Sequence, residues 1–372
     1  MKVPAAASFL VAFLFLAACA PPRDMAAPPP SRSLRVANYN LWHGLDPVGV
    51  WKFREYETPE GRERRLQAFL KIARETDADL WFLEEVNPAP KLAARLAREL
   101  GMDEIHQVDN CGMRLGVGLP VNLRSGLAIL ARKGAGLRKL AGPKLSGPPG
   151  FCGDLAGFQW KEFRYGLVGE MRWNGERVLV ADTHLHHGPE VDGPLDADLA
   201  KLAAEGKIDR AKAGEVRRTV LGSTVRRHAE LEALFATLDR LGARETPVIF
   251  GGDLNLSPDS EEMGRILARG LASVSGPWDP ATGLYTWDLE RNPNTKFSLD
   301  FELPYDFTDP DVVRVLRYAA TRTRRLDYVL FRDPAGRWSA RDARLLGDRP
   351  VDGLFPSDHF GLAAVIDSNG IR

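Results

Sequence analysis

Polar side chains that could carry out hydrolytic chemistry stand at the ends of apolar runs along most of this 372-residue chain. A polar group at such a place costs stability when it is buried without a partner. A series of these positions therefore indicates a functional site built at strand ends. Six places share the pattern, and they carry Asn40, Glu85, His184, Asp253 with Asn255, Asp327, and Asp358 with His359.

Carboxylates, amides and imidazoles in this combination suit the hydrolysis of a phosphate ester. Attack at phosphorus brings negative charge to an anionic group, so the protein must neutralise charge, aim a water and protonate the leaving oxygen. A hard cation, Mg²⁺ or Mn²⁺, binds oxygen ligands and needs only one or two carboxylates. We expect Glu85 and Asn40 to hold that metal, with Asp358 completing the site. His184 and His359 are the expected acid and base groups, because an imidazole titrates near neutrality.

A transition-metal site is the alternative for the histidines. His184, His186 and His187 lie close together in the sequence, and alternation along a strand would place His184 and His186 on one face. No cysteine or further ligand series accompanies them, so this alternative is disfavoured.

Strands and helices must alternate to position these residues. Apolar runs predict strands, and Thr58-Pro59 marks a helix start that buries Leu66, Phe69 and Leu70 on one face. A second helix buries a face that includes Leu231 and Leu234. Gly- and Pro-rich or charged stretches predict insertions or surface loops that rim the site at residues 134–154, 188–218 and 287–311, of which 188–218 is expected to be partly helical. Strands are expected at residues 34–40, 78–86, 126–132, 178–185, 247–254, 326–331 and 360–366. This interleaving predicts one α/β domain over residues 34–372.

The six motifs together resemble the endonuclease/exonuclease/phosphatase superfamily, which has the deoxyribonuclease-I-like fold. That family pattern runs through a strand ending in Asn, then Leu-Gln-Glu-Val, Thr-His-Leu, Gly-Asp-Phe-Asn, Arg-Ile-Asp-Tyr and Ser-Asp-His. All six occur here in order, with Glu84 for Gln, Leu254 for Phe and Leu326 for Ile. The resemblance implies an α/β fold of two packed mixed β-sheets flanked by helices, a four-layer α/β sandwich with the site at one end.

The resemblance also implies roles for individual residues. Asp327 would orient His359, as a carboxylate orients a catalytic imidazole elsewhere. Asp253 and Asn255 would hold the attacking water and a phosphate oxygen. The implied activity is that of a metal-dependent phosphodiesterase or phosphatase. The expected partner is a phosphate-ester substrate, either nucleic acid or a phospholipid head group, and no protein partner is implied.

The N-terminus predicts export with a lipid anchor. Lys2 precedes an apolar run that is too short to span a bilayer, so residues 1–18 are typical of a signal peptide. Leu16-Ala17-Ala18-Cys19 resembles a bacterial lipobox, which predicts lipidation of Cys19 and attachment to the outer membrane or cell envelope. Residues 19–33 are rich in Ala and Pro and are expected to form a tether.

Two observations leave alternatives open. Cys111 and Cys152 could form a disulfide in an oxidising compartment, or remain two buried thiols. The 50 basic and 50 acidic residues balance, so no bulk positive charge favours nucleic acid over a phospholipid.

A catalytically inactive surface-binding lipoprotein with the same fold is the competing hypothesis.

Overall fold

The computed structural model describes residues 32–43, 58–119, 124–298 and 305–369. The predicted signal peptide, Cys19 and the tether up to residue 31 lie outside these residues. Within the described ranges, no helix combines the length and the apolar character needed to cross a membrane.

Two mixed β-sheets form the centre of the molecule. The first has the strand order β16-β17-β1-β2-β6-β3 and the second the order β14-β15-β13-β12-β11-β7, with β8 paired to β11. The first sheet contains β1 (Ser33–Asn40), β2 (Leu80–Val86), β3 (Met102–Asn110), β6 (Ser125–Arg132), β16 (Trp338–Leu346) and β17 (Gly361–Ser368). The second contains β7 (Arg138–Ala141), β8 (Lys144–Ser146), β11 (Arg164–Trp173), β12 (Glu176–His184), β13 (Val248–Asp253), β14 (Ala272–Ser273) and β15 (Asp327–Arg332).

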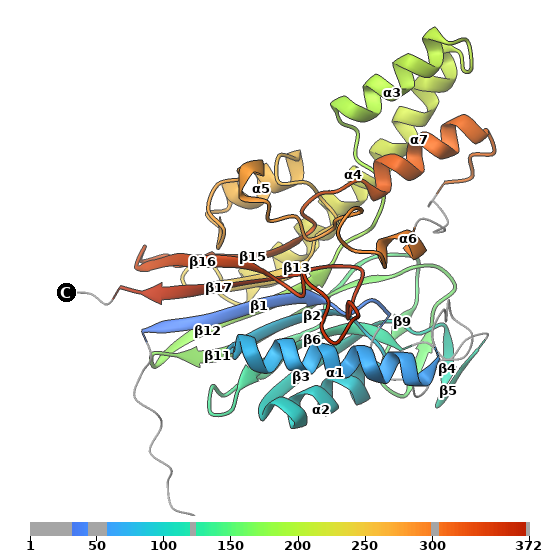
Figure 1. The fold of residues 1–372 in the computed structure, drawn as a ribbon. Coiled ribbons are helices and arrows are strands. Elements are labelled where there is room, and N and C mark those ends of the chain that lie inside the picture. Colours follow the sequence, from blue (N-terminus) through green and yellow to red (C-terminus); the bar gives the residue numbers. More distant parts are fainter. Residues whose placement is uncertain (1–31, 44–57, 120–123, 299–304, 370–372) are drawn as a thin grey trace, which may run out of the picture.

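Helices cover the outer faces of both sheets (Figure 1). Helices α1 (Pro59–Thr76) and α2 (Ala89–Leu100) lie on the first sheet, and α4 (Arg210–Arg240) and α5 (Glu261–Ala268) lie on the second. Helix α1 begins where predicted, because the Thr58 side chain accepts a hydrogen bond from the Gly61 backbone N–H. The predicted four-layer α/β sandwich is confirmed.

Apolar side chains from both sheets interdigitate in the centre of the sandwich. Phe82 of β2 and Ile129 of β6 belong to the same buried cluster as Val180 of β12 and Ile249 of β13. Two further clusters lie between each sheet and its helices. Because side chains alternate along a strand, each sheet contributes apolar residues to the layer between the sheets and to the layer beneath its helices. The sandwich therefore has three apolar layers.

Three helices form a projection at one end of the sandwich (Figure 1). Helix α3 (Gly193–Ala204), the first part of α4 and α7 (Pro310–Thr321) bury their own cluster, which includes Leu199, Val216 and Leu316. The stretch 188–218, expected to be a partly helical insertion or surface loop, is thus largely helical. The short helix α6 (Thr295–Ser298) and a 3₁₀ turn (Pro280–Thr282) complete the helices of the described residues.

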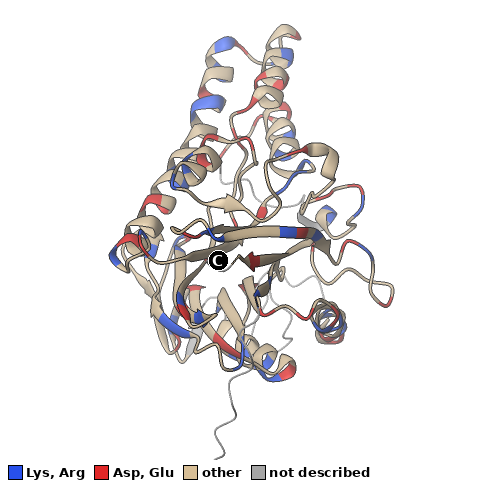
Figure 2. Cartoon of the chain, turned by 90° about the vertical axis from the view of Figure 1, so that its left-hand side faces the viewer, with Lys and Arg blue, Asp and Glu red and all other residues tan. Residues whose placement is uncertain are grey.

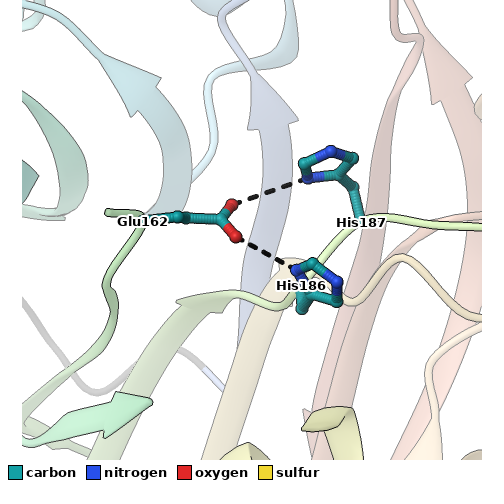
Figure 3. A group of neighbouring side chains, drawn as sticks. All are labelled: Glu162, His186 and His187. Carbon is teal, nitrogen blue, oxygen red and sulfur yellow. Dashed lines mark hydrogen bonds and ion pairs between the residues drawn. The ribbon is translucent and has the colours of Figure 1, made fainter. Parts of the chain in front are cut away.

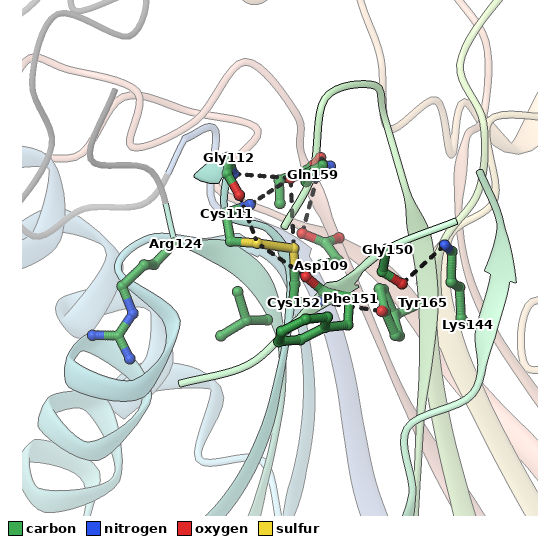
Figure 4. The surroundings of a disulfide bond; sticks show 12 residues. Asp109, Cys111, Gly112, Arg124, Lys144, Gly150, Phe151, Cys152, Gln159 and Tyr165 are labelled. Atoms are coloured by element: carbon green, nitrogen blue, oxygen red, sulfur yellow. Dashed lines mark hydrogen bonds between the residues drawn. A yellow bond between two sulfur atoms is a disulfide. The ribbon is translucent and has the colours of Figure 1, made fainter. Parts of the chain in front are cut away.

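A small third sheet lies at the same end, with the order β5-β4-β10-β9. Its strands are β4 (Met113–Leu115), β5 (Val117–Leu119), β9 (Phe151–Cys152) and β10 (Ala156–Phe158). The predicted loop 134–154 therefore contains the strands β7, β8 and β9. Cys111 and Cys152 form a disulfide with a Cα–Cα distance of 5.8 Å, which attaches β9 to the end of β3 (Figure 4).

The two ends of the described chain lie together. Ser33 of β1 is the register partner of Asp367 of β17, and the start of β1 and the end of β17 lie at the left-hand end of the sandwich in Figure 1. The strands β1 and β2 run from this end toward the small sheet. Lys, Arg, Asp and Glu residues are interspersed over the elements seen from this end (Figure 2), consistent with the zero net charge.

Candidate active site

Strand register brings the predicted residues to one end of the sandwich. Asn40 at the end of β1 pairs with Glu84 of the parallel strand β2. In the second sheet, His184 at the end of β12 pairs with Asp253, and Asp253 pairs with Asp327 of β15. Because the two sheets pack face to face, the side chains at these strand ends converge.

Asp253 lies at the centre of these converging side chains. Its Oδ2 accepts a hydrogen bond from Asn40 Nδ2 at 3.0 Å and lies 3.5 Å from Nε2 of His184. Nε2 of His359 lies 3.8 Å from the same oxygen. Burial and then the neighbouring Asp327 raise the pKa of Asp253 to about 7, against the opposing effect of His359. This carboxyl group can therefore exchange a proton near neutral pH.

Asp327 and His359 form a buried pair. Nδ1 of His359 lies 2.8 Å from Oδ2 of Asp327. The hydroxyl of Thr286 accepts the backbone N–H of Asp327 at 3.1 Å, which fixes the start of β15. The ring of Trp287 packs edge-on against His359 with centroids 4.9 Å apart. Trp287 thus restrains the imidazole, with its indole N–H bonded to the Thr321 carbonyl.

The two imidazoles have opposite electrostatic environments. Burial and the nearby Arg164 guanidinium lower the pKa of His184 well below its usual value. Burial also opposes the charge on His359, but the Asp327 and Asp253 carboxylates outweigh it and raise the pKa of His359 well above its usual value. At neutral pH, His184 is therefore neutral and His359 is charged, a division typical of acid and base pairs.

Glu85 and Asn40 lie together beside this cluster. Asn40 Nδ2 lies 3.2 Å from Oε1 of Glu85, and Oε2 accepts the His43 backbone N–H at 2.7 Å. Glu85 has a left-handed backbone with φ of 53°, where β2 departs from regular pairing with β6. Burial raises the pKa of this carboxyl group, but the contacts with His43 hold it well below its usual value. An ionised carboxylate suits a hard divalent cation. Asn40 would bind the cation through Oδ1, which here accepts the Trp42 backbone N–H at 2.9 Å.

Asn255 and Asp358 flank the cluster. Asn255 follows β13 with φ of 50°, and its Nδ2 donates to the Leu185 carbonyl at 3.1 Å. Its backbone N–H donates to Oδ1 of Asp253, so the two residues form a compact turn. Asp358 is buried and accepts a hydrogen bond from the Ser357 hydroxyl. Its predicted role as a metal ligand stays a prediction.

A second possible ligand set lies within the same cluster. Asp253, Asp327 and His359 can each offer a ligand atom within 4.8 Å of the others. The Asp327–His359 contact already occupies Nδ1 of the imidazole, which leaves Nε2 facing Asp253. These three residues are thus a second candidate group for the metal, and the expected roles of Glu85 and Asn40 as its ligands stay a prediction.

His186 and His187 form a separate group with Glu162 (Figure 3). The two carboxylate oxygens of Glu162 lie 3.1 Å from Nδ1 of His186 and 3.5 Å from Nδ1 of His187. The predicted common strand face for His184 and His186 is wrong, because β12 ends at His184. Arg164 and Arg226 both form ion pairs with Glu162, so its charge is already compensated and a cation there is disfavoured.

Arg164 is the site residue that the sequence motifs do not reveal. It is buried at the start of β11, which pairs with β12, and it forms an ion pair with Glu162. Its charge acts on His184 and Asp253. A guanidinium at this place can attract an anionic phosphate group. Only the register of β11 against β12 could have identified it.

A family model for "Endonuclease/Exonuclease/phosphatase family" matches residues 37–359, which include every residue of the site. The chain belongs to this family. Membership in the endonuclease/exonuclease/phosphatase family supports a metal-dependent phosphoester hydrolase, in agreement with the carboxylates and imidazoles brought together here. The search of curated proteins finds no match.

Solved structures of the endonuclease/exonuclease/phosphatase family share the fold at low identity. A family protein from Bacteroides thetaiotaomicron is 17% identical, with a TM-score of 0.53, over 91% of this chain and 98% of that chain. Humanized TDP2 from D. rerio is 15% identical, also with a TM-score of 0.53, over 91% of this chain and 100% of that chain. D. rerio TDP2 complexed with a single-strand DNA product is 17% identical, with a TM-score of 0.50, over 90% and 99%. These similarities establish the fold.

Proposed function

We propose that this protein is an exported, lipid-anchored hydrolase that cleaves phosphate ester bonds with the help of a divalent metal. The observation that carries the proposal is the position of Asp253. Its carboxylate contacts Asn40 and His184, and it faces the Asp327–His359 pair. Carboxylate, amide and imidazole groups thus surround one position at the end of the sandwich.

Glu85 and Asn40 would hold Mg²⁺ or Mn²⁺, which would neutralise negative charge on a phosphate oxygen. Asp253, with its pKa of about 7, would accept the proton of an attacking water oriented with the help of Asn255. His359, kept charged by Asp327, would stabilise the anionic transition state through its Nε2–H. Neutral His184 and charged Arg164 would position the phosphate group.

Two substrate classes fit this chemistry. The D. rerio TDP2 structure contains a single-strand DNA product, which supports a nucleic acid substrate by analogy of fold. The balanced charge of the chain provides no general attraction for nucleic acid, so a phospholipid head group is the second candidate. Both share the phosphate ester at which the proposed reaction occurs.

A substrate panel tests the activity. Full-length protein is assayed on double-stranded DNA, RNA, sphingomyelin, phosphoinositides and an artificial phosphodiester, with Mg²⁺, with Mn²⁺ and with a chelator. We expect chelation to abolish turnover and His359→Ala to reduce it by roughly 100- to 10,000-fold. Replacement of a histidine outside the site, His106→Ala, provides the matched control and should retain activity.

Two results would contradict the proposed activity. Turnover that survives chelation or the His359→Ala substitution would exclude the proposed mechanism. A well-folded protein that turns over none of the substrates would favour the inactive surface-binding lipoprotein.

The lipid anchor is tested separately. Radioactive fatty acid should label the wild-type protein in a bacterial host and fail to label Cys19→Ser. Equal labelling of both proteins would refute lipidation at Cys19.

A further inference from the structure

The small sheet exposes a concentration of large apolar side chains. In the described part of the chain, six of the ten exposed large apolar residues belong to this sheet or directly follow it. Leu115, Leu155 and Trp160 are 87%, 79% and 67% exposed. We call the group the apolar face, and it comprises Met113, Leu115, Phe151, Leu155, Phe158 and Trp160. Clustered exposure of this kind marks an interaction surface.

Strand register places these side chains on one side of the sheet. Leu115 of β4 pairs with Ala156 of β10, and Phe158 pairs with Phe151 of β9. Since side chains alternate along a strand, Met113 lies on the same side as Leu115. Leu155 occupies the turn between β9 and β10, and the rings of Phe158 and Trp160 pack edge-on with centroids 5.3 Å apart.

The opposite side of the sheet is fastened to the body of the protein. Cys152 points inward to the disulfide with Cys111, and its backbone N–H donates to the Tyr165 hydroxyl of β11. Gln159 accepts the backbone N–H groups of Cys111 and Gly112 through its side-chain carbonyl (Figure 4). These attachments hold the apolar face outward and oppose its collapse onto the core.

The apolar face adjoins the active site. Asp109, at the end of β3 and two residues before Cys111, interacts electrostatically with Arg164 and Glu85. On the other side, Glu162 follows two residues after Trp160 and forms an ion pair with Arg164, whose charge acts on His184. A surface that covers the apolar face therefore lies next to the catalytic cluster.

We propose that the apolar face docks on a lipid bilayer that carries anionic head groups. Arg124 and Lys144 lie on either side of the disulfide that supports the sheet (Figure 4), and Lys161 is exposed beside Trp160. Glu162 is already paired with Arg164 and Arg226, which leaves Asp154 of the β9–β10 turn as the acidic residue near the face, so cations predominate there. Apolar and aromatic side chains with a basic border are typical of surfaces that insert into the boundary between head groups and acyl chains.

The chemistry of the face favours lipid over nucleic acid. Single-stranded nucleic acid binds to aromatic rings that stack on bases along a positively charged groove. Here the two most exposed members are leucines, which cannot stack, and the chain as a whole has no net charge. Acyl chains accept aliphatic and aromatic side chains equally.

Docking would select the substrate class of the neighbouring site. With the bilayer on the apolar face, the catalytic cluster lies beside the head groups, so phosphate esters of lipids become its substrates. This consequence rests on the proposed function, whereas docking itself requires no catalysis. The docking experiment is therefore done with a chelator, and its result is independent of hydrolysis.

Tryptophan fluorescence provides the test. Full-length wild-type and Trp160→Phe proteins are mixed with vesicles of phosphatidylglycerol and phosphatidylethanolamine whose acyl chains either contain or lack bromine, a short-range quencher. The difference between the two proteins isolates the emission of Trp160. We expect bromine to reduce that emission by roughly half or more, because an inserted face reaches the acyl-chain boundary. Vesicles of phosphatidylcholine alone should give weaker quenching.

Matched variants separate the apolar face from other contacts. Trp278→Phe removes a partly exposed tryptophan outside the face, and its difference emission should not respond to bromine. Leu115→Ser with Leu155→Ser should abolish quenching of Trp160, whereas Leu221→Ser with Val225→Ser, at exposed positions on α4, should leave it unchanged.

Three results would overturn the proposal. Trp160 emission that brominated lipid does not quench excludes insertion, even when the N-terminus attaches the protein to the vesicle. Quenching by single-stranded DNA in place of lipid would assign the face to nucleic acid. A blue shift of Trp160 emission that depends on protein concentration without lipid would assign it to a second copy of the chain.

Discussion

His184 and His359 lie on either side of one carboxylate, yet their pKa values shift in opposite directions. His184 is neutral because it is buried near Arg164, and His359 is charged because two carboxylates outweigh its burial. Asp253 lies between them with a pKa of about 7. The site thus holds one neutral imidazole, one imidazolium and a carboxyl group that titrates near neutrality, as proton transfer requires.

Asp109 provides a test of buried charge close to the site. Burial raises its pKa to about 7 from 3.8, although Arg164 partly opposes the shift. Its contribution to stability is therefore fully present below about pH 4 and is lost as the pH rises toward 7. We expect Asp109→Asn to lack this loss, so that its free energy of unfolding exceeds that of the wild type increasingly from pH 4 to 7, by up to a few kcal/mol. Chemical denaturation at several pH values measures the difference.

A matched substitution at an exposed aspartate supplies the control for Asp109. Asp259→Asn should follow the wild-type pH profile. If Asp109→Asn also runs parallel to the wild type over this range, the carboxyl group is not buried as described.

Motifs at strand ends revealed most of the site from the sequence. Asn40, Glu85 and Asp253 stand out because a polar group ends an apolar run, and the structure brings all three together. Arg164 does not stand out, because an arginine at the start of a strand is common on protein surfaces. Only the pairing of β11 with β12 places Arg164 in the site. The prediction that His184 and His186 share a strand face was wrong, because side chains alternate only within a strand and β12 ends at His184.

At the scale of elements, the disulfide supports a sheet of very short strands. Strands of two to four residues bury little and depend on covalent or tertiary support. The disulfide joins β9 to the end of β3 across 41 residues of sequence. It constrains the unfolded chain as well as the sheet, and the two effects add to stability.

Removal of this disulfide should destabilise the protein. We expect the double substitution Cys111→Ser and Cys152→Ser to lower the free energy of unfolding by up to roughly 4 kcal/mol on the chain-entropy model. Urea denaturation measures the loss, and reduced wild-type protein should behave like the variant. Equal stability of the oxidised and reduced wild type would be inconsistent with a structural disulfide.

Long elements could be predicted and short ones could not. The strands β1, β2 and β13 are each six residues or longer and contain several large apolar residues, and the sequence located each within two residues. The stretch 134–154 was interpreted as a loop because Gly and Pro dominate it. Its strands form because β7 and β8 pair with β11 and β9 pairs with β10. The residues of the stretch itself show no pattern that predicts these pairings.

At the scale of the whole molecule, the packing of the two sheets decides the geometry of the site. Gly251 of β13 faces Phe82 of β2, and a Cβ atom at Gly251 would lie 2.2 Å from Cγ of that ring. Asp253 is two residues further along β13 and faces Asn40 of the opposite sheet. The same close approach therefore sets the distance between the two halves of the site.

Gly251→Ala should push the sheets apart. We expect a loss of roughly 1–3 kcal/mol in the free energy of unfolding, because a well-packed core resists an added methyl group. Gly264→Ala, on the helix α5 where a Cβ meets nothing within 4 Å, is the control and should stabilise slightly. Thermal unfolding of both variants measures the contrast, and a neutral effect at Gly251 would argue against the close approach.

Because Ser33 and Asp367 are paired, the segments before β1 and after β17 leave the body at one pole, opposite the catalytic end. A bead or an affinity tag attached to either terminus should therefore leave the mouth of the site open to large substrates. The proposed lipid at Cys19 would act at that rear pole, because the 13 residues 20–32 can extend over at most roughly 45 Å. The two proposed membrane contacts, the lipid at one pole and the apolar face at the other end, would together place the long axis of the sandwich along the membrane plane.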